Sequence, residues 1–117
     1  MTIKLNTAQH YTMMEALRRY LKFNDRKESI TECWTGLNYY SYVKDVIDAG
    51  YMEWVGNNPH ERCAGWLRLT INGSKIVNKW IELGYTTLKF FRYNGNDWEY
   101  PLNSEGNMPP RIIEIDD

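Results

Sequence analysis

Few residues in this chain have the chemistry that catalysis or metal binding requires. His10 and His60 are the only histidines, and Cys33 and Cys63 are the only cysteines. The spacing of His60 and Cys63 could hold a metal ion, but a site with four ligands would also need Cys33 and His10 from distant segments. A surface histidine and a buried thiol are the ordinary explanation. Because the sequence also has no nucleophile elbow, glycine-rich phosphate loop or HExxH pattern, we expect no enzyme, metal or cofactor.

A second set of polar side chains has the chemistry to bind DNA. Asn38, Ser41 and Tyr42 fall on the polar side of a stretch with helical periodicity. In the major groove, asparagine can form two hydrogen bonds to adenine, so these residues are candidates for contacts to base edges. Lys44 would lie closer to a phosphate. Asp45 would repel phosphate unless it accepts a hydrogen bond from cytosine or pairs with a basic residue.

Basic residues are concentrated around this stretch. From Arg18 to Lys44 there are six basic and three acidic residues, whereas from Tyr85 to Asp117 there are three basic and six acidic ones. A basic segment beside a DNA-reading helix provides a surface for phosphate contacts. The candidates for these contacts are Arg18, Arg19, Lys22, Arg26 and Lys27. A solvated surface without a partner would show the same modest charge, and this alternative stays open.

The element that must position these side chains is a helix over residues 37–49. Its apolar side carries Tyr39, Tyr40, Val43, Val46 and Ile47, which repeat with a period of 3.6 residues. Packing between helices is the ordinary role of these tyrosines. Gly50 ends the helix, because glycine readily adopts the left-handed conformation of a helix C-terminus.

A β-hairpin is predicted directly after this helix. Its strands are Tyr51 to Val55 and Trp66 to Leu69, and its tip contains the turn formers Gly56 to Pro59. Side chains near the tip that could reach an adjacent minor groove are Asn57, Asn58, His60 and Arg62. Thr70 is placed to cap a helix over residues 72–83, whose inward side would carry Ile76, Trp80 and Leu83.

The flanking segments predict further elements. A helix capped by Asn6 or Thr7 should run to about Phe23, and a short second helix should span Ser29 to Trp34, with Ser29 and Glu32 at the spacing of a capping box. Met1 to Leu5 could form a short strand or arm. After residue 84, aromatic residues alternate around Asn94-Gly95, which is typical of a hairpin, and residues 112–115 could form a last strand.

The segment from Thr35 to Gly73 resembles a known family. The run VKDVIDAGYM over residues 43–52 resembles the end of the recognition helix and the start of the wing in MarR-like winged-helix repressors. Leu69-Thr70 followed by Gly73 matches the signature at the end of their wing, and Glu61-Arg62 stands near the position of their acidic residue and arginine at the wing tip.

The resemblance implies an α+β winged helix-turn-helix fold. Residues 1–84 would form it, with a three-helix core, a β-hairpin wing over 51–69 and a fourth helix, and residues 85–117 would add a hairpin and acidic tail packed on the same domain. The family commonly continues into long C-terminal helices that build its dimer. This sequence departs from that pattern, so a homodimer stays an open possibility.

Composition agrees with a single ordinary domain. The chain has 117 residues, of which 43% are hydrophobic and 25% charged, and its net charge is −1. No apolar run approaches the roughly 20 residues that span a bilayer, and the first residues do not resemble a signal peptide. Two cysteines do not make a disulfide framework, so we expect a cytoplasmic protein with reduced thiols.

These patterns leave two functional hypotheses. The first is a sequence-specific transcriptional regulator that places helix 37–49 in the major groove of double-stranded DNA. The second is a small phage or accessory protein that uses a winged-helix scaffold to bind a protein of a host machine through residues 88–117. Surplus aromatic residues, a slightly acidic total charge and the unusual C-terminal segment motivate the second hypothesis.

Overall fold

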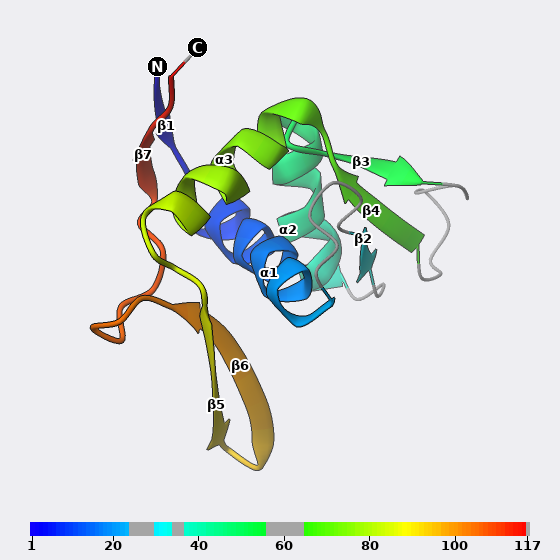
Figure 1. Ribbon diagram of the computed structural model, residues 1–117. Coiled ribbons are helices and arrows are strands. Elements are labelled where there is room, and N and C mark those ends of the chain that lie inside the picture. The colour runs from blue at the N-terminus through cyan, green and yellow to red at the C-terminus, as the bar shows by residue number, and fades with distance from the viewer. Residues whose placement is uncertain (24–29, 34–36, 56–64, 117) are drawn as a thin grey trace.

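The described residues form three helices and seven strands, a mixture that is compatible with the predicted α+β class. The computed structural model describes residues 1–23, 30–33, 37–55 and 65–116 (Figure 1). In chain order the elements are β1 (Thr2–Lys4), α1 (Thr7–Phe23), β2 (Ile30–Cys33), α2 (Leu37–Asp48), β3 (Met52–Val55), β4 (Gly65–Leu69), α3 (Ile71–Glu82), β5 (Thr87–Tyr93), β6 (Asn96–Leu102) and β7 (Ile112–Glu114).

The first helix begins where the sequence predicts. The Asn6 side chain accepts a hydrogen bond from the backbone N–H of Gln9 at 2.7 Å, and the Gln9 side chain accepts one from the backbone N–H of Asn6 at 2.9 Å. This reciprocal arrangement is a capping box, and it satisfies two donors at the helix start. Asn6 is therefore the cap of α1.

A single core lies between the three helices and the strands that cover them. Met13 and Leu17 of α1, Val43 and Val46 of α2, and Trp80 of α3 are fully buried in it. Ile113 and Ile115 belong to the same cluster, so the C-terminal segment contributes to the core of residues 1–84. The predicted inward orientation of Leu83 is wrong, because this residue follows the last turn of α3 and is 50% exposed.

The predicted second helix is also wrong. Ile30 to Cys33 form strand β2, which pairs antiparallel with β4 from Ile30 opposite Arg68 to Cys33 opposite Gly65. The β-branched residues Ile30 and Thr31 favour a strand, and the free edge of β4 supplies hydrogen-bond partners that a short isolated helix would lack. The described helices are thus α1, α2 and α3, without the additional helix that the sequence predicts at 29–34.

The resulting sheet has the order β2-β4-β3 and lies beside α2 (Figure 1). β3 and β4 form the predicted hairpin, with Met52 opposite Leu69 and Val55 opposite Trp66. The hairpin tip, residues 56–64, lies outside the described residues. The sheet therefore combines the predicted hairpin with a strand that the sequence did not reveal.

A compact joint connects α2, β3 and α3. At the end of α2, Gly50 has a φ of 79°, and the N–H groups of Gly50 and Tyr51 donate to the carbonyls of Ile47 and Val46 at 3.0 and 2.9 Å. This is the Schellman arrangement that the glycine predicts. Thr70 caps α3 by accepting from the N–H of Gly73 at 3.2 Å, and its hydroxyl donates to the carbonyl of Gly50 at 2.5 Å. One threonine thus joins the end of α2 to the start of α3.

Two further antiparallel pairs complete the fold. β5 and β6 form the predicted hairpin, in which Asn94 and Gly95 have φ angles of 51° and 76°, as a type I′ turn requires. The turn of this hairpin projects from the molecule, while its strands contact α1 (Figure 1). β1 and β7 pair at the other side of the molecule and bring the two ends together. None of the helices in the described part of the chain has the length and apolar character needed to cross a bilayer.

Candidate nucleic-acid interface

Helix α2 is held to the body through one side. Val43 and Val46 are fully buried, whereas Lys44 and Asp48 are exposed on the opposite side. The β3–β4 hairpin follows directly from the end of this helix. The structure places the backbone of Asn38, Ser41 and Tyr42 in the N-terminal half of α2, and their side chains lie outside the described part of the chain.

The charged side chains on the described part of α2 interact with their neighbours. Lys44 donates to the Asp48 carboxylate at 2.5 Å. The side chain of Asn6 donates to the Asp45 carboxylate at 3.1 Å, and the side chain of Gln9 donates to the Asp45 carbonyl at 3.4 Å. Asp45 therefore fastens α2 to the cap of α1. This is a structural role for an acidic residue that is unfavourable beside a phosphate.

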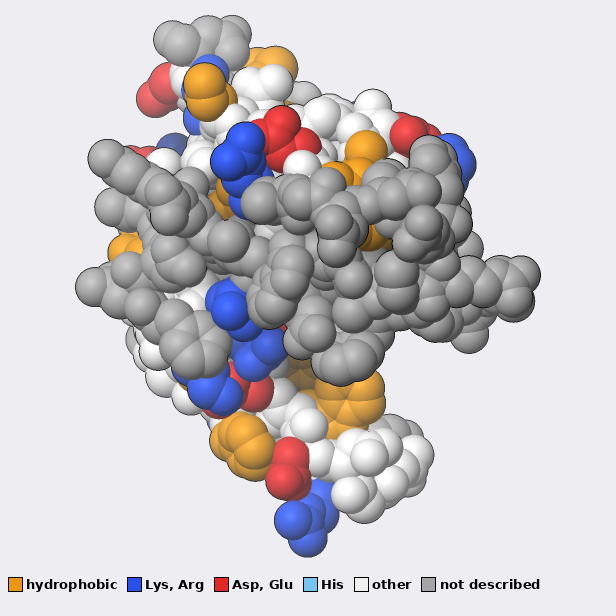
Figure 2. All heavy atoms as spheres, turned by 90° about the vertical axis from the view of Figure 1, so that its right-hand side faces the viewer, with side chains coloured by type: hydrophobic (Ala, Val, Ile, Leu, Met, Phe, Trp, Pro, Cys, Tyr) orange, Lys and Arg blue, Asp and Glu red, His pale blue; other side chains and the backbone are white. Residues whose placement is uncertain are grey.

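The hairpin that would form a wing also carries a charge pair. Arg68 of β4 donates to the carboxylate of Glu53 on β3 at 2.7 Å, and the two residues lie directly opposite each other in the ladder. Figure 2 shows the face that lies on the right of Figure 1, where acidic side chains accompany the basic ones of the described residues. The described part of this face is therefore mixed in charge.

Two of the three predicted phosphate-contacting residues of α1 face the C-terminal hairpin. Arg18 donates to Glu15 at 3.2 Å and to Glu99 of β6 at 3.1 Å, and the ammonium of Lys22 lies 3.7 Å from the same Glu99 carboxylate. Burial lowers the pKa of the Arg18 guanidinium, but the two carboxylates outweigh this effect and raise the pKa above its ordinary value. Arg18 and Lys22 thus help to attach β6 to α1, and Arg19 is half-buried on the same helix.

Several predicted residues cannot be placed relative to this interface. Arg26, Lys27, Asn57, Asn58, His60 and Arg62 lie outside the described residues, as does Cys63 of the metal hypothesis. Within the ranges that the structure describes, no three residues of the types histidine, cysteine, aspartate and glutamate are grouped so that they could hold a metal ion.

The other histidine has a structural environment. His10 is buried, its Nε2 lies 2.7 Å from the carbonyl oxygen of Pro109, and its ring makes a T-shaped contact with that of Trp80, with the ring centroids 5.9 Å apart. Burial lowers the pKa of His10 and the charge of Arg111 acts in the same direction, whereas the bond to Pro109 opposes them. The ring is therefore neutral near pH 7 and donates its Nε2 proton to the carbonyl.

Comparison with known proteins adds no assignment for this site. The sequence matches no family model, and no curated protein and no solved structure matches it. The sequence also does not indicate the role of Glu99, whose carboxylate interacts with both Arg18 and Lys22. Its 81-residue separation from Arg18 offers no local signal that the two charges meet.

Proposed function

We propose that this chain is a winged-helix DNA-binding regulator that reads its site through the N-terminal half of α2. The observation that supports this proposal most is the arrangement around α2. One side of the helix packs into the core, and the helix leads through the joint at Gly50 into a two-stranded hairpin. A helix held in this way can enter a major groove while the hairpin contacts the adjacent backbone or minor groove.

The scaffold differs from the helix-turn-helix that the resemblance implies. In the described residues between α1 and α2 the chain forms β2, which extends the sheet of the hairpin. A strand before the reading helix, placed at the outer edge of the hairpin sheet, is compatible with a winged helix. In this proposal α2 is supported by the sheet on one side and by α1 on the other.

The charge pairs determine what kind of binding we expect. Lys44 and Arg68 are neutralised by Asp48 and Glu53, and Arg18 and Lys22 face Glu99. These four cations of the described residues are therefore already paired, so we expect only a few phosphate contacts and a discrimination that depends on base contacts. If about two to four phosphates are contacted, log K should fall with log salt with a slope of about −2 to −4.

Two pairs of substitutions test this proposal against a duplex selected from a random library. The Asn38→Ala/Ser41→Ala variant should lose about tenfold or more of the preference for the selected duplex over a scrambled one, since a good base contact contributes about 1–3 kcal/mol of discrimination. The Arg26→Gln/Lys27→Gln variant should bind both duplexes more weakly and reduce the salt slope by about two. Fluorescence anisotropy over a salt series measures both quantities.

Lys22→Gln is the matched control, because Lys22 lies on the basic segment but faces Glu99. It should leave the salt slope and the sequence preference unchanged. If the purified wild-type protein binds no duplex at low salt, the proposal is wrong.

A second function is favoured by one observation, the exposure of Phe90. This ring is 61% exposed on the β5–β6 hairpin, whose turn projects from the molecule (Figure 1), and it lies opposite Glu99 in the ladder. An exposed aromatic side chain on a projecting hairpin can anchor a protein partner. We propose, as the alternative, an accessory protein that binds a larger protein assembly through this hairpin.

The substitution Phe90→Ser tests the alternative without disturbing the core. A partner captured by the wild-type protein should be lost with Phe90→Ser and retained with Lys89→Gln, which changes the exposed neighbour on the same strand. Deletion of residues 88–117 would be uninformative, because it removes β7 and the buried Ile113. Equal capture by Phe90→Ser and the wild type would refute this role of the hairpin.

A further inference from the structure

The β5–β6 hairpin is a sheet of only two strands, so each strand has one edge that its partner does not cover. The turn at Asn94-Gly95 determines which backbone groups point outward. In a type I′ hairpin the residues that flank the turn, here Tyr93 and Asn96, form a hydrogen-bonded pair, and bonded and non-bonded pairs then alternate along the ladder. The residues of β5 whose N–H and C=O groups point away from β6 are Leu88, Phe90 and Arg92.

The opposite edge of the hairpin, on β6, cannot pair with a further strand along its whole length. Its outward residues are Asp97, Glu99 and Pro101, which lie opposite the outward residues of β5. Proline has no N–H, so this edge lacks a donor at Pro101, whose side chain is also fully buried. A proline on a sheet edge protects that edge from pairing. Of the two edges of this hairpin, β5 is therefore the one with an unbroken row of donors and acceptors.

The β5 edge is also open to solvent. Phe90 is 61% exposed, and Lys89 and Arg92 on the same strand are exposed as well. Among the described residues, none outside β6 forms a hydrogen bond with the backbone of residues 88–92. An exposed edge with free N–H and C=O groups is a template for an extended segment of another chain, a mode of recognition called β-augmentation.

The side chains along this edge indicate the chemistry of the segment that fits it. Successive residues of a strand point to opposite faces, so Leu88 and Phe90 share one face and Lys89 lies on the other. An added strand would place an apolar side chain beside Phe90 and, one residue along, a second side chain beside Lys89. A carboxylate at that second position would be attracted to the ammonium group.

The charge of β5 distinguishes between two kinds of occupant. The strand carries Lys89 and Arg92 and no acidic residue. Arg92 pairs with Asp97 of β6, whereas Lys89 has no ion pair with another described residue. A second copy of β5 would add like charge to this edge, which is unfavourable between neighbouring strands. An acidic segment of a different protein is therefore a better match than a second copy of this chain.

We propose that β5 binds an extended segment of a protein partner in which apolar and acidic residues alternate, and that this segment becomes a third strand of the β5–β6 sheet. The inference rests on the alternative function, in which the hairpin binds a protein, and it specifies the part of the hairpin that is used. Backbone hydrogen bonds supply most of the affinity, because one exposed ion pair contributes little. Phe90 and Lys89 set the preference for apolar and acidic side chains.

Amide hydrogen exchange of the ¹⁵N-labelled full chain, followed by NMR, tests this pairing. The probe is a capped hexapeptide of alternating valine and glutamate. In the free protein the amides of Leu88, Phe90 and Arg92 should exchange rapidly, whereas the amide of Lys89, which pairs with Tyr100, should be protected. At saturating peptide the three outward amides should exchange about tenfold more slowly or less, and that of Lys89 should change little.

Two further peptides separate backbone pairing from charge. A hexapeptide that is N-methylated at its central residues has no donors there, so it should leave the outward amides of β5 unprotected. A hexapeptide of alternating valine and lysine should bind about threefold more weakly than the glutamate peptide, and Lys89→Glu should remove this preference. Both comparisons use the wild-type chain, so they do not depend on whether a variant folds.

The variant Phe90→Pro adds a test on the side of the protein. It removes an outward N–H without removing a bond to β6, because Phe90 occupies a non-bonded position of the ladder. The peptide should no longer protect Leu88 and Arg92, while the amide of Lys89 should stay protected. Phe90→Val is the matched control, since it keeps the N–H and a side chain suited to a strand, and it should retain the protection.

Several outcomes would overturn the proposal. One is protection of the outward amides that rises with protein concentration without peptide, because a second copy would then occupy the edge. Equal protection by the N-methylated peptide or equal binding of the lysine peptide would also overturn it. If the glutamate peptide protects none of these amides while Phe90→Ser still loses a captured partner, the hairpin binds proteins through side chains alone, and only the inference of strand addition is wrong.

Discussion

Replacing Trp80 with alanine should lower the free energy of unfolding by about 3–5 kcal/mol, the range for large aromatic residues removed from a core. Trp80 is fully buried near the C-terminal end of α3, and its ring makes a T-shaped contact with the ring of His10. Its indole Nε1 donates to the carbonyl of Pro110 at 3.1 Å. The substitution therefore leaves a cavity and also removes the donor that holds the segment leading to β7.

Urea denaturation followed by circular dichroism measures this loss. Trp80→Phe should fall between the wild type and Trp80→Ala, because it keeps a ring in the core but lacks the indole donor. Leu83→Ala is the matched control near the end of the same helix, and it should change stability by less than about 0.5 kcal/mol because Leu83 is half exposed. A loss below about 1 kcal/mol for Trp80→Ala would contradict the central position of this side chain.

The substitution Gly73→Ala should be the most damaging small change in the joint between α2 and α3. A Cβ atom at Gly73 would lie 2.0 Å from the carbonyl oxygen of Tyr51, which is a backbone atom and cannot rotate away. That oxygen also accepts the N–H of Thr70 at 3.1 Å. Relief of the clash must therefore move the connection between α2 and β3 or the start of α3.

We expect Gly73→Ala to lower the free energy of unfolding by about 2 kcal/mol or more. Overpacking costs about 1–3 kcal/mol or more, and the gain in helix propensity of about 1 kcal/mol offsets only part of it. Asn72→Ala, one residue earlier and exposed, is the control and should be neutral or slightly stabilising. Thermal and urea denaturation of the two variants give the comparison. A Gly73→Ala protein as stable as the wild type would show that the two segments are not in this close contact.

Elements with a local signal could be predicted from the sequence. Helix α1 has its cap at Asn6, α3 has its cap at Thr70, and the β5–β6 turn has Asn94-Gly95, and each of these signals is confirmed by hydrogen bonds or backbone angles. The hairpin formed by β3 and β4 is confirmed by its register. These features depend on residues a few positions apart, so their physics is present in a short stretch of sequence.

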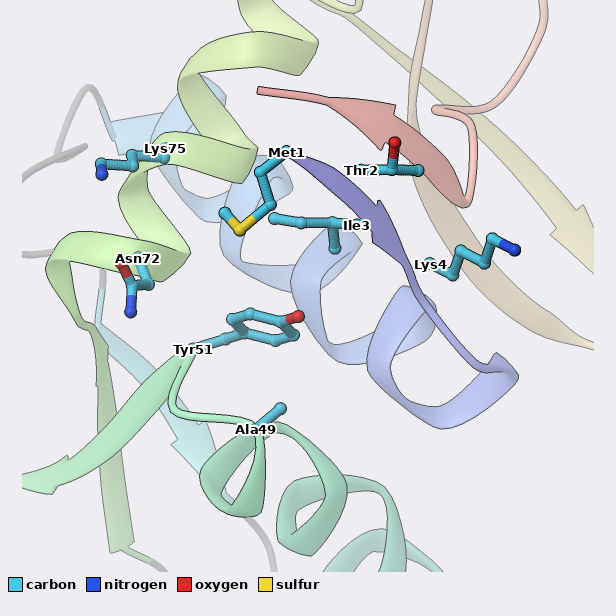
Figure 3. A pocket seen from close by; sticks show the side chains of 8 residues that line it. All are labelled: Met1, Thr2, Ile3, Lys4, Ala49, Tyr51, Asn72 and Lys75. Carbon is cyan, nitrogen blue, oxygen red and sulfur yellow. The ribbon is translucent and has the colours of Figure 1, made fainter. Parts of the chain in front are cut away.

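Features that depend on distant partners could not be predicted. Ser29 and Glu32 have the spacing of a capping box, which predicts a helix here, but pairing with β4 decides the conformation of residues 30–33. Likewise, the charge of Arg18 and Lys22 suggested a phosphate surface, whereas Glu99 from the far end of the chain faces them. The space beside Tyr51 likewise lies between residues of three separate segments, which are β1, the end of α2 with the residues after it, and the start of α3 (Figure 3).

The pairing of β1 with β7 has a consequence for how the protein is made. Ile3 lies opposite Ile113, and the amino group of Met1 contacts the carbonyl of Ile115, 114 positions away in sequence. A growing polypeptide cannot close its hydrophobic interior until residue 113 has emerged from the ribosome, so the helices made before it stay incompletely covered until then. Interrupted synthesis would release chains with an open core, which are the species that chaperones and proteases recognise.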